Sequence, residues 1–350
     1  MTLKQLLRRL VETPGVSGNE EKIRELIRDE VEEHADEVEV DDFGNLIVRK
    51  GSGEKTLMLD AHMDQIGLTV RRIDDAGFIR VSKVGGIYPE SLINQRVKIH
   101  TSEGEDLTGV IGTKPVHRKD EEEKKQLPDM HDLFVDIGAE DREDAESLGV
   151  NKGDFISYDR DFAELENGYV TGPAFDDRVG CAIAIKALER FDSELDYELA
   201  VVFSAQEEVG RKGAQTAAYG VDPDVALALD ISMAGDVPAM DADDSTDETG
   251  KGIGIDMLQA GGRGLITPAK IRDWLLETGE SGDHRYFRSL YDGGTTDASV
   301  INLVRGGIPS GSIGIPTRNI HTPVEVVKMS DLEAAVDFLE HAFETFPEHF

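Results

Sequence analysis

Two adjacent glutamates, Glu207 and Glu208, follow an apolar stretch of strand length in the segment VVFSAQEEVG, residues 201–210. The apolar run predicts a strand, and the glycines after the pair predict a turn that leads into a helix. Neighbouring carboxylates at the end of a strand repel each other unless a positive charge lies between them. The segment therefore indicates a site that holds a cation.

Four other segments place residues that can bind metals beside apolar strands. They are LMLDAHMDQIG with His62 and Asp64, TGPAFDDRVG with Asp176 and Asp177, LALDIS with Asp230, and IPTRNIHTPVE with His321. Each residue has an ordinary explanation by itself, because aspartates are common in turns and before helices. Taken together, two imidazoles and several carboxylates form the nitrogen and oxygen donor set that suits zinc or cobalt. The set is larger than one tetrahedral ion needs, so it predicts two divalent ions that share a bridging carboxylate.

An α/β fold with a mostly parallel or mixed sheet and helices on both faces is expected to position these residues. Apolar segments predict strands at 56–64, 198–205, 225–232 and 311–315. Helices are expected from Val179, from Gly213, over 268–278 and from Ser330. In such a sheet, ligands bind beyond the carboxyl ends of the strands, which is where the candidate residues lie.

The sequence pattern changes between residues 65 and 167, where short segments of alternating apolar and polar residues are separated by glycine-rich turns. This pattern is typical of a small β-domain. We expect an inserted β-rich domain at 65–167 and a catalytic domain made of 1–64 and 168–350. Near the N-terminus, Ser17 and Glu20 resemble a capping box ahead of an amphipathic helix at 23–34.

Charge is the strongest compositional signal, because 71 acidic residues face 37 basic ones and the formal net charge is −34. Nucleic acid is excluded as a partner, since binding to phosphates needs a basic face. The acids are scattered along the chain, which favours adaptation to a salt-rich, halophilic cytoplasm. No apolar run approaches the ~18 residues of a membrane span, so no membrane partner is expected. The lone cysteine, Cys181, cannot form an intrachain disulfide and is expected to be a small buried residue on a helix.

Six motifs together resemble the M42 family of metallo-aminopeptidases, which includes the self-compartmentalising TET enzymes: AHMDQIG, GPAFDDRVG, AQEEVGRKGA, LALDIS, TTDAS and IPTRNIHTPVE. GGIYPESLINQRV and DLFVDIGAEDREDAESLGV resemble the dimerisation domain of that family, at 65–167. The resemblance covers nearly the whole chain in the right order. It implies a zinc-peptidase-like fold, two Zn²⁺ or Co²⁺ ions per subunit, short peptides with a free N-terminus as substrates, and a tetrahedral homo-dodecamer.

The resemblance also implies a role for each candidate ligand. Asp176 would bridge the two ions, with His62 and Asp230 completing one site and Glu208 and His321 the other. The family pattern usually has a tyrosine where this chain has Asn319, which puts only the local packing in doubt.

Three further roles follow from the same resemblance. Glu207 would be the general base that takes a proton from the metal-activated water. Asp64 would orient His62 and set its basicity. Asp177 would stay out of direct contact with the metals and follow Asp176 through a cis peptide bond.

Two other functions stay open as alternatives. A glycoside hydrolase would need two carboxylates about 5–9 Å apart, and the adjacent Glu207 and Glu208 are poorly placed for that, with Trp274 as the only tryptophan. A non-catalytic binding protein would leave the complete donor set without a purpose. Asp297 is expected either to line the substrate pocket or to cap a helix. An acidic chain offers few cations, so a neutral or apolar N-terminal residue is the expected substrate preference.

Overall fold

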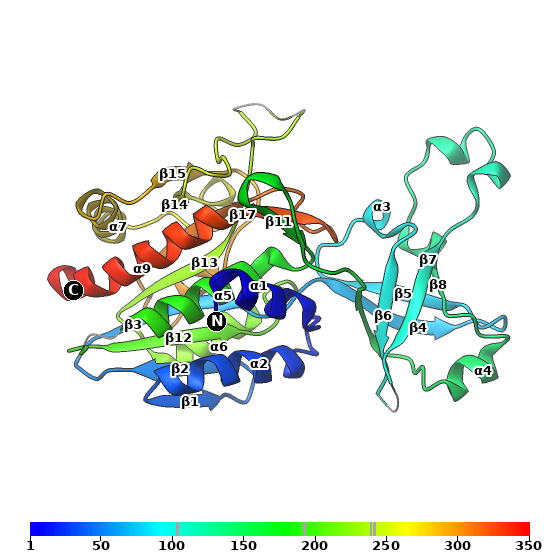
Figure 1. The fold of residues 1–350 in the computed structure, drawn as a ribbon, viewed down its shortest axis with the longest axis horizontal. Coiled ribbons are helices and arrows are strands. Elements are labelled where there is room, and N and C mark those ends of the chain that lie inside the picture. The colour runs from blue at the N-terminus through cyan, green and yellow to red at the C-terminus, as the bar shows by residue number, and fades with distance from the viewer. Residues whose placement is uncertain (103–104, 192–193, 239, 241–242) are drawn as a thin grey trace.

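A computed structural model describes residues 1–350 except 103–104, 192–193, 239 and 241–242. Figure 1 shows an eight-stranded mixed sheet covered by helices, with a small closed β-barrel beside it. The predicted fold class, a mixed sheet with helices on both faces and a small β-rich unit, is confirmed. None of the described helices is long and apolar enough to cross a membrane.

The large sheet brings the carboxyl ends of four parallel strands to one edge. Its order is β1 (Glu37–Val40), β2 (Leu46–Lys50), β12 (Glu198–Ser204), β3 (Thr56–His62), β13 (Val225–Met233), β16 (Ser310–Thr317), β14 (Ile253–Leu258) and β15 (Tyr286–Leu290). The neighbours β12, β3, β13 and β16 are parallel, whereas β2 pairs antiparallel with β12 and β14 antiparallel with β16. Side chains that follow the parallel strands therefore meet at one place.

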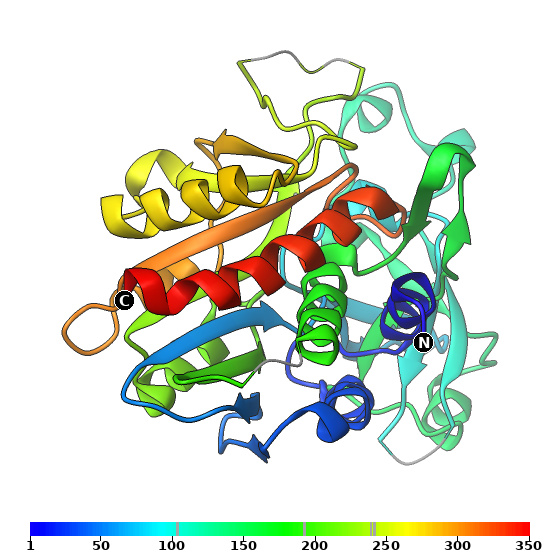
Figure 2. The same ribbon diagram turned by 60° about the vertical axis from the view of Figure 1, so that its left-hand side comes forward.

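Helices cover both faces of this sheet. One face carries α1 (Leu3–Glu12), α2 (Glu21–Val31), α5 (Phe175–Arg190), α7 (Ala269–Ser281) and α9 (Met329–His349), and the other carries α6 (Lys212–Val221) and α8 (Ala298–Ile301). The strand side chains alternate between the two layers as a pleated strand requires, with Leu57 and Leu59 in the first core and Met58 in the second. Figure 2 shows α9 and α5 crossing the near side of the sheet, with α7 beside α9.

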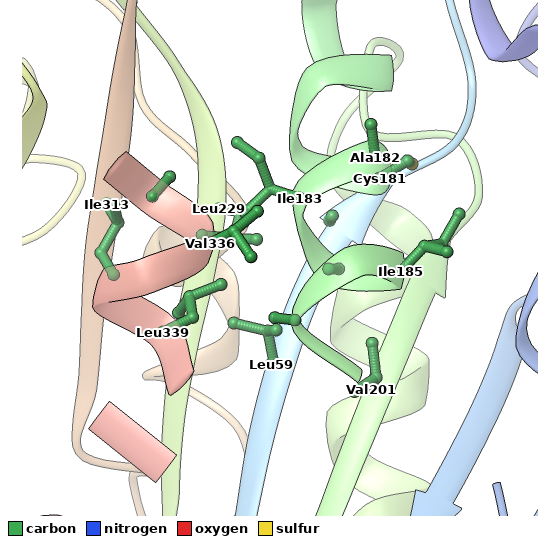
Figure 3. Packing of buried hydrophobic residues seen from close by; sticks show 14 of the residues in the cluster. Leu59, Cys181, Ala182, Ile183, Ile185, Val201, Leu229, Ile313, Val336 and Leu339 are labelled. Carbon is green, nitrogen blue, oxygen red and sulfur yellow. The ribbon is translucent and has the colours of Figure 1, made fainter. Parts of the chain in front are cut away.

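Helix α5 is buried on nearly every side, from Phe175 to Leu188. In Figure 3, Leu339 of α9 lies next to Leu59 of β3, and Ile183 of α5 lies next to Val336 of α9. A helix that is apolar all round belongs inside a protein, because each of its faces needs a packing partner. Cys181 is buried on this helix, as expected. The packing fixes the position of the N-terminal turn of α5, which carries Asp176.

The closed barrel is antiparallel, in the order β4 (Gly67–Ile73), β5 (Ile79–Val84), β8 (Phe134–Asp136), β7 (Leu107–Gly112), β6 (Arg96–His100) and β9 (Phe155–Tyr158). Along β6, Val97 and Ile99 are buried in the barrel core while Arg96 and Lys98 are exposed. Closure pairs both edges of the sheet, so the strands leave no open edge. All six strands lie inside the segment 65–167.

Short elements connect these units. A three-stranded sheet is formed by β10 (Ala163–Glu164), β11 (Tyr169–Gly172) and β17 (Glu325–Lys328). Two short helices are α3 (Pro89–Leu92) and α4 (Arg142–Ser147). Single 3₁₀ turns are η1 (Glu32–His34), η2 (Val116–Arg118), η3 (Glu123–Lys125), η4 (Met130–Asp132), η5 (Glu166–Gly168) and η6 (Ala260–Gly262).

The capping box expected at Ser17 is wrong. Helix α2 begins at Glu21, and its N-cap residue Glu20 makes no capping hydrogen bond with its side chain. The Ser17 hydroxyl instead donates to Asp64 at 2.5 Å. A hydroxyl at a helix start can bond locally or to a distant partner, and here the distant carboxylate is preferred.

Candidate metal centre and active site

The five predicted metal ligands come together at the carboxyl edge of the sheet. His62 ends β3, Asp230 lies in β13, Glu208 follows β12, Asp176 lies in the first turn of α5, and His321 lies between β16 and β17. They form two clusters, and within each cluster the donor atoms lie within 4.8 Å of one another. The first cluster is His62, Asp176 and Asp230, and the second is Asp176, Glu208 and His321. Asp176 belongs to both clusters.

Each carboxylate oxygen of Asp176 faces a different imidazole. Oδ1 lies 3.0 Å from Nε2 of His62, and Oδ2 lies 3.3 Å from Nε2 of His321. Nε2 of His321 is also 3.5 Å from Oε2 of Glu208. A carboxylate with its two oxygens turned toward two separate clusters has the geometry needed to bridge two cations.

Backbone carbonyls fix the orientation of both imidazoles. Nδ1 of His62 lies 3.3 Å from the carbonyl oxygen of Asp64, and Nδ1 of His321 lies 3.1 Å from that of Gly86. Because a carbonyl oxygen only accepts, each Nδ1 carries the proton and each Nε2 is left to bind a cation. A side chain on Gly86 would place its Cβ 2.6 Å from Nδ1 of His321, so the approach requires glycine.

The electrostatics of the clusters fit bound cations. Burial, together with the nearby charge of Asp176, raises the pKa of Glu208 and of Asp230 well above the ordinary values. Burial would also raise the pKa of Asp176, but hydrogen bonds from His321 and His62 hold it below the ordinary value. Within the described residues, Oε1 of Glu208 is buried without a hydrogen-bond partner. The donors therefore need more positive charge than the protein supplies, and their nitrogen and oxygen chemistry suits zinc or cobalt.

Glu207 belongs to neither donor cluster. Its Oε2 lies 3.9 Å from Nε2 of His62, and burial is the main cause that raises its pKa well above the ordinary value. Glu207 therefore stands beside the clusters with a carboxylate that holds a proton more readily than usual, as a general base requires.

Asp64 connects the end of β3 to the loop that carries both glutamates. Its carboxylate accepts from the backbone N–H of Glu207 at 2.9 Å and of Glu208 at 3.3 Å. The Ser17 hydroxyl is a third donor to it. Its Oδ1 also lies 3.4 Å from Nδ1 of His62, as a residue that orients this imidazole should.

Glu325 is a buried residue of the site to which the sequence analysis gave no role. Its carboxylate accepts from the backbone N–H of Asp176 at 3.2 Å and of His321 at 2.8 Å. Burial, helped by the charge of Asp176, raises the pKa of Glu325 to about 8. The sequence did offer a signal for Glu325, because this carboxylate lies four residues after His321 in the same motif.

The structure also places the two remaining aspartates of the prediction. The peptide between Asp176 and Asp177 is cis, and Asp177 accepts from the backbone N–H of Gly180 at 2.9 Å, outside both donor clusters. Asp297 is the N-cap residue of α8, but its side chain makes no capping hydrogen bond and accepts instead from the Ser204 hydroxyl at 2.9 Å. Asp297 is absent from the lining of the cavity at the site, so neither expected role is seen.

A cavity of about 600 Å³ opens onto the clusters. Its walls include Asp176, Glu207, Glu208, Asp230 and His321, followed by Arg211, Met233, Tyr291, Gly293, Gly294, Thr295, Thr296 and Ile320.

Within the described residues, none of the other histidines belongs to a cluster of three metal-competent groups. Asn319 has a left-handed φ of 58°, which asparagine tolerates, and its side chain donates to the carbonyl of Val324.

Comparison with known proteins decides the family. The family described as M42 glutamyl aminopeptidase matches residues 44–338, which include all five candidate ligands. The chain belongs to the M42 peptidase family. It is 34% identical to the lysyl aminopeptidase of Pyrococcus furiosus, over 95% of this chain and 94% of that protein.

Solved peptidase structures share its fold. The aminopeptidase APDkam598 of Desulfurococcus kamchatkensis has a TM-score of 0.94 and 37% identity, over 98% of this chain and 94% of that one. The TET1 peptidase of Pyrococcus horikoshii, which can assemble into a tetrahedron or a large octahedral shell, has a TM-score of 0.87 and 33% identity, over 97% and 98%. The chain is thus an enzyme of the M42 aminopeptidase family, with a candidate metal site at the carboxyl edge of its sheet.

Proposed function

We propose that this M42 enzyme is a dinuclear, metal-dependent aminopeptidase that removes N-terminal residues from peptides. The observation that carries the proposal is the position of the Asp176 carboxylate. Its Oδ1 lies 3.0 Å from Nε2 of His62, and its Oδ2 lies 3.3 Å from Nε2 of His321. His62, Asp176 and Asp230 would hold one ion, and Asp176, Glu208 and His321 the other. Zn²⁺ or Co²⁺ suits this donor set.

The chain's own residues supply the proton transfers. When bound, the two ions would polarise the scissile carbonyl and lower the pKa of a water beside it. Glu207, whose carboxylate lies 3.9 Å from Nε2 of His62, takes the proton of the attacking water and passes it to the leaving amine. Asp64 holds the backbone of Glu207 in place during both transfers.

The acidity of the site favours substrates with a free N-terminus. Four of the side chains that line the cavity are carboxylates: Asp176, Glu207, Glu208 and Asp230. A positively charged α-amine would be attracted by the carboxylate oxygens that the ions leave free, whereas an acylated amine carries no charge to attract. This selection restricts cleavage to the first residue of a peptide.

We also propose that the enzyme works as a homo-oligomer in a salt-rich cytoplasm, most simply as a tetrahedral dodecamer. The P. horikoshii TET1 peptidase, at 33% identity, can assemble into a tetrahedron or a large octahedral shell, and the segment 65–167 would supply the dimer contacts. The net charge of −34 supports the adaptation to salt.

The test is hydrolysis of an aminoacyl-p-nitroanilide, of the same compound with its amine acetylated, and of carboxymethylcellulose. We expect cleavage of the first substrate only, loss of activity after prolonged chelation, and recovery with zinc or cobalt. Full activity in a preparation shown to be free of metal would contradict the proposal.

The glycoside hydrolase alternative has little support in the structure. Trp274, the one tryptophan, is fully buried and donates to the Thr345 hydroxyl, so it offers no surface for stacking a sugar. A non-catalytic binding protein would not need a buried base beside two donor clusters. Hydrolysis of carboxymethylcellulose, or no hydrolysis of any substrate by the metal-loaded protein, would revive these alternatives.

A further inference from the structure

We propose that Ser157, His100 and Asp106 form a second catalytic site, which hydrolyses small uncharged esters without using a metal. Oγ of Ser157 lies 2.8 Å from Nε2 of His100, and Oδ2 of Asp106 lies 3.0 Å from Nδ1 of the same ring. A hydroxyl, an imidazole and a carboxylate in this order are the arrangement of a serine hydrolase, which is recognised by geometry rather than by sequence position. The proposal does not depend on the aminopeptidase function.

The pairing of barrel strands places the three side chains together. Strands β6 and β9 are antiparallel, with Lys98 opposite Ser157 and His100 opposite Phe155. Because side chains alternate along a strand, Lys98, His100 and Ser157 share the face that points away from the barrel core. Asp106 directly precedes β7, the other neighbour of β6. The closed barrel therefore holds the nucleophile, the base and the carboxylate on adjacent strands.

The surroundings of His100 favour the protonation state that a general base needs. Burial is the main cause that lowers the pKa of His100, although the nearby Asp106 opposes the shift. A neutral imidazole has one N–H, which belongs on Nδ1 beside the carboxylate, so Nε2 is free to accept from the Ser157 hydroxyl. Asp106 is held from its other side by Lys22, whose Nζ lies 3.5 Å from the same Oδ2.

A cavity of about 270 Å³ gives a small substrate access to these groups. Ser157, His100 and Asp106 all line it, and it lies where the barrel meets the residues around Pro14 and Pro173. Among the described residues, its walls share no member with the cavity at the donor clusters. The site is therefore separate from the candidate metal centre.

The charges of this cavity indicate an uncharged substrate. Its walls carry both signs, with the basic residues Lys98 and Arg160 and the acidic residues Glu12, Asp159 and Asp161. An ionic substrate would be attracted by one set and repelled by the other. A small ester without a charge meets neither difficulty.

The reaction uses only groups that line the cavity. Oγ of Ser157 attacks the ester carbonyl carbon while Nε2 of His100 takes the hydroxyl proton. Lys98, opposite Ser157 on the strand ladder, supplies the positive charge for the carbonyl oxygen as it becomes negative. The ester C–O bond then breaks, and the alcohol leaves with the proton from His100. Water removes the acyl group by the same route, giving its proton to His100, which returns it to Oγ of Ser157.

A simpler role for the pair makes a different prediction. If Ser157 and His100 only satisfy each other's hydrogen bond, as buried polar groups usually do, Ser157 would react no faster than an ordinary serine. Ser82 on β5 of the same barrel is half-buried and is not part of the cavity wall. Ser82→Ala is therefore a matched loss of one hydroxyl.

The first experiment follows p-nitrophenol release from p-nitrophenyl butyrate by the metal-loaded protein, with and without an excess of chelator. We expect a burst of about one equivalent per subunit, followed by slower turnover, in both conditions. Ser157→Ala should abolish both phases, and Ser82→Ala should change neither. His100→Gln and Asp106→Asn should slow the burst by roughly 10²-fold or more, because they remove the base and the group that orients it.

The second experiment treats the wild type with an alkyl phosphonofluoridate and locates the adduct by peptide mass spectrometry. We expect phosphonylation of Ser157, and no adduct on Ser82. This result does not depend on whether any variant folds.

Four results would overturn the proposal. They are the absence of an adduct on Ser157, a burst that survives in Ser157→Ala, acylation without later turnover, and ester hydrolysis that chelation abolishes and zinc restores. The last result would assign the ester hydrolysis to the metal centre. Failure of the aminopeptidase proposal would be seen separately, with the aminoacyl-p-nitroanilide.

Discussion

Glu207 and Glu208 are neighbours in the chain but face different partners. Oε2 of Glu208 lies 3.5 Å from Nε2 of His321, inside one donor cluster. Oε2 of Glu207 lies 3.9 Å from Nε2 of His62 and belongs to no cluster. The backbone N–H groups of both residues donate to Asp64, which holds this segment in place. The pair can therefore divide the work between proton transfer and metal binding.

The first prediction separates these two roles by amide substitution. Glu207→Gln keeps the shape of the side chain but cannot accept a proton, so kcat should fall by roughly 10²–10⁴ while both metals stay bound. Glu208→Gln removes an anionic ligand, so one ion should bind more weakly and excess zinc should recover part of the activity. The measurement is the metal content of each purified variant, together with kcat with and without added zinc.

The opposite pattern would reverse the assignment. Normal turnover in Glu207→Gln would exclude it as the base. Loss of metal from Glu207→Gln, with full metal in Glu208→Gln, would mean that the two residues have each other's role.

The sequence predicted the donor residues better than their supporting groups. His62, Asp230 and Glu208 follow apolar strands, and parallel strands bring such positions together whatever the loops do. Arg211 and Ser17 instead bond to residues in loops that are distant in the chain, Thr295 and Asp64. Nothing in their local sequence indicates a partner, because each contact depends on how two loops are packed.

At the scale of elements, strand β14 carries a buried ionisable residue outside the site, Asp256. Its Oδ2 accepts from the side chain of Gln259 at 2.8 Å and from the Tyr291 hydroxyl at 3.2 Å. Its Oδ1 is buried without a partner among the described residues. Burial raises the pKa of Asp256 from 3.8 to about 6, although these hydrogen bonds oppose the shift.

The second prediction is the pH dependence that this residue confers. Between pH 3.8 and about 6 the folded protein holds a proton on Asp256 that the unfolded chain has released. Stability must therefore fall as the pH rises through this window, by about 3 kcal/mol at most from this group. Asp256→Asn cannot ionise and should lack this fall. Thermal midpoints of both proteins from pH 4 to 7 should converge at the acidic end and favour the variant at the neutral end. Parallel curves would contradict the assigned pKa.

Secondary structure was predictable where burial gives the apolar residues a regular spacing, and it was less predictable at the ends of helices. The strands at 56–64 and 225–232 were expected, because a short continuous apolar run is typical of a buried strand. The start of α2 was misjudged at Ser17, because a serine three residues before a glutamate has the pattern of a capping box whether or not its hydroxyl is already bonded elsewhere. A local pattern carries no information about Asp64, which lies far along the chain.

At the scale of the whole molecule, charge is the dominant feature. The net charge of −34 makes the folded chain repel itself wherever salt does not screen it. Many of the ion pairs lie at the surface, such as Lys4 with Glu164, and such pairs contribute little to stability.

The third prediction is that assembly and stability depend on salt. Lowering KCl from molar concentrations to about 0.1 M extends the range of charge repulsion to about 10 Å. We expect the oligomer to dissociate and the thermal midpoint to fall along this series, as followed by light scattering and by thermal melts. A metal-loaded sample is the control that separates this effect from metal loss. A stable monomer at high salt, or indifference to salt, would argue against the proposed assembly and adaptation.

We propose that Asp176 would help to hold two cations, and that these ions make the chain an active aminopeptidase. A titration of chelated protein, shown to be free of metal, with zinc or cobalt tests this proposal while the hydrolysis of a free aminoacyl-p-nitroanilide is followed. We predict no activity without metal and a rise that levels off at two equivalents per subunit. Full activity without metal, or a plateau reached at one equivalent, would overturn the proposal.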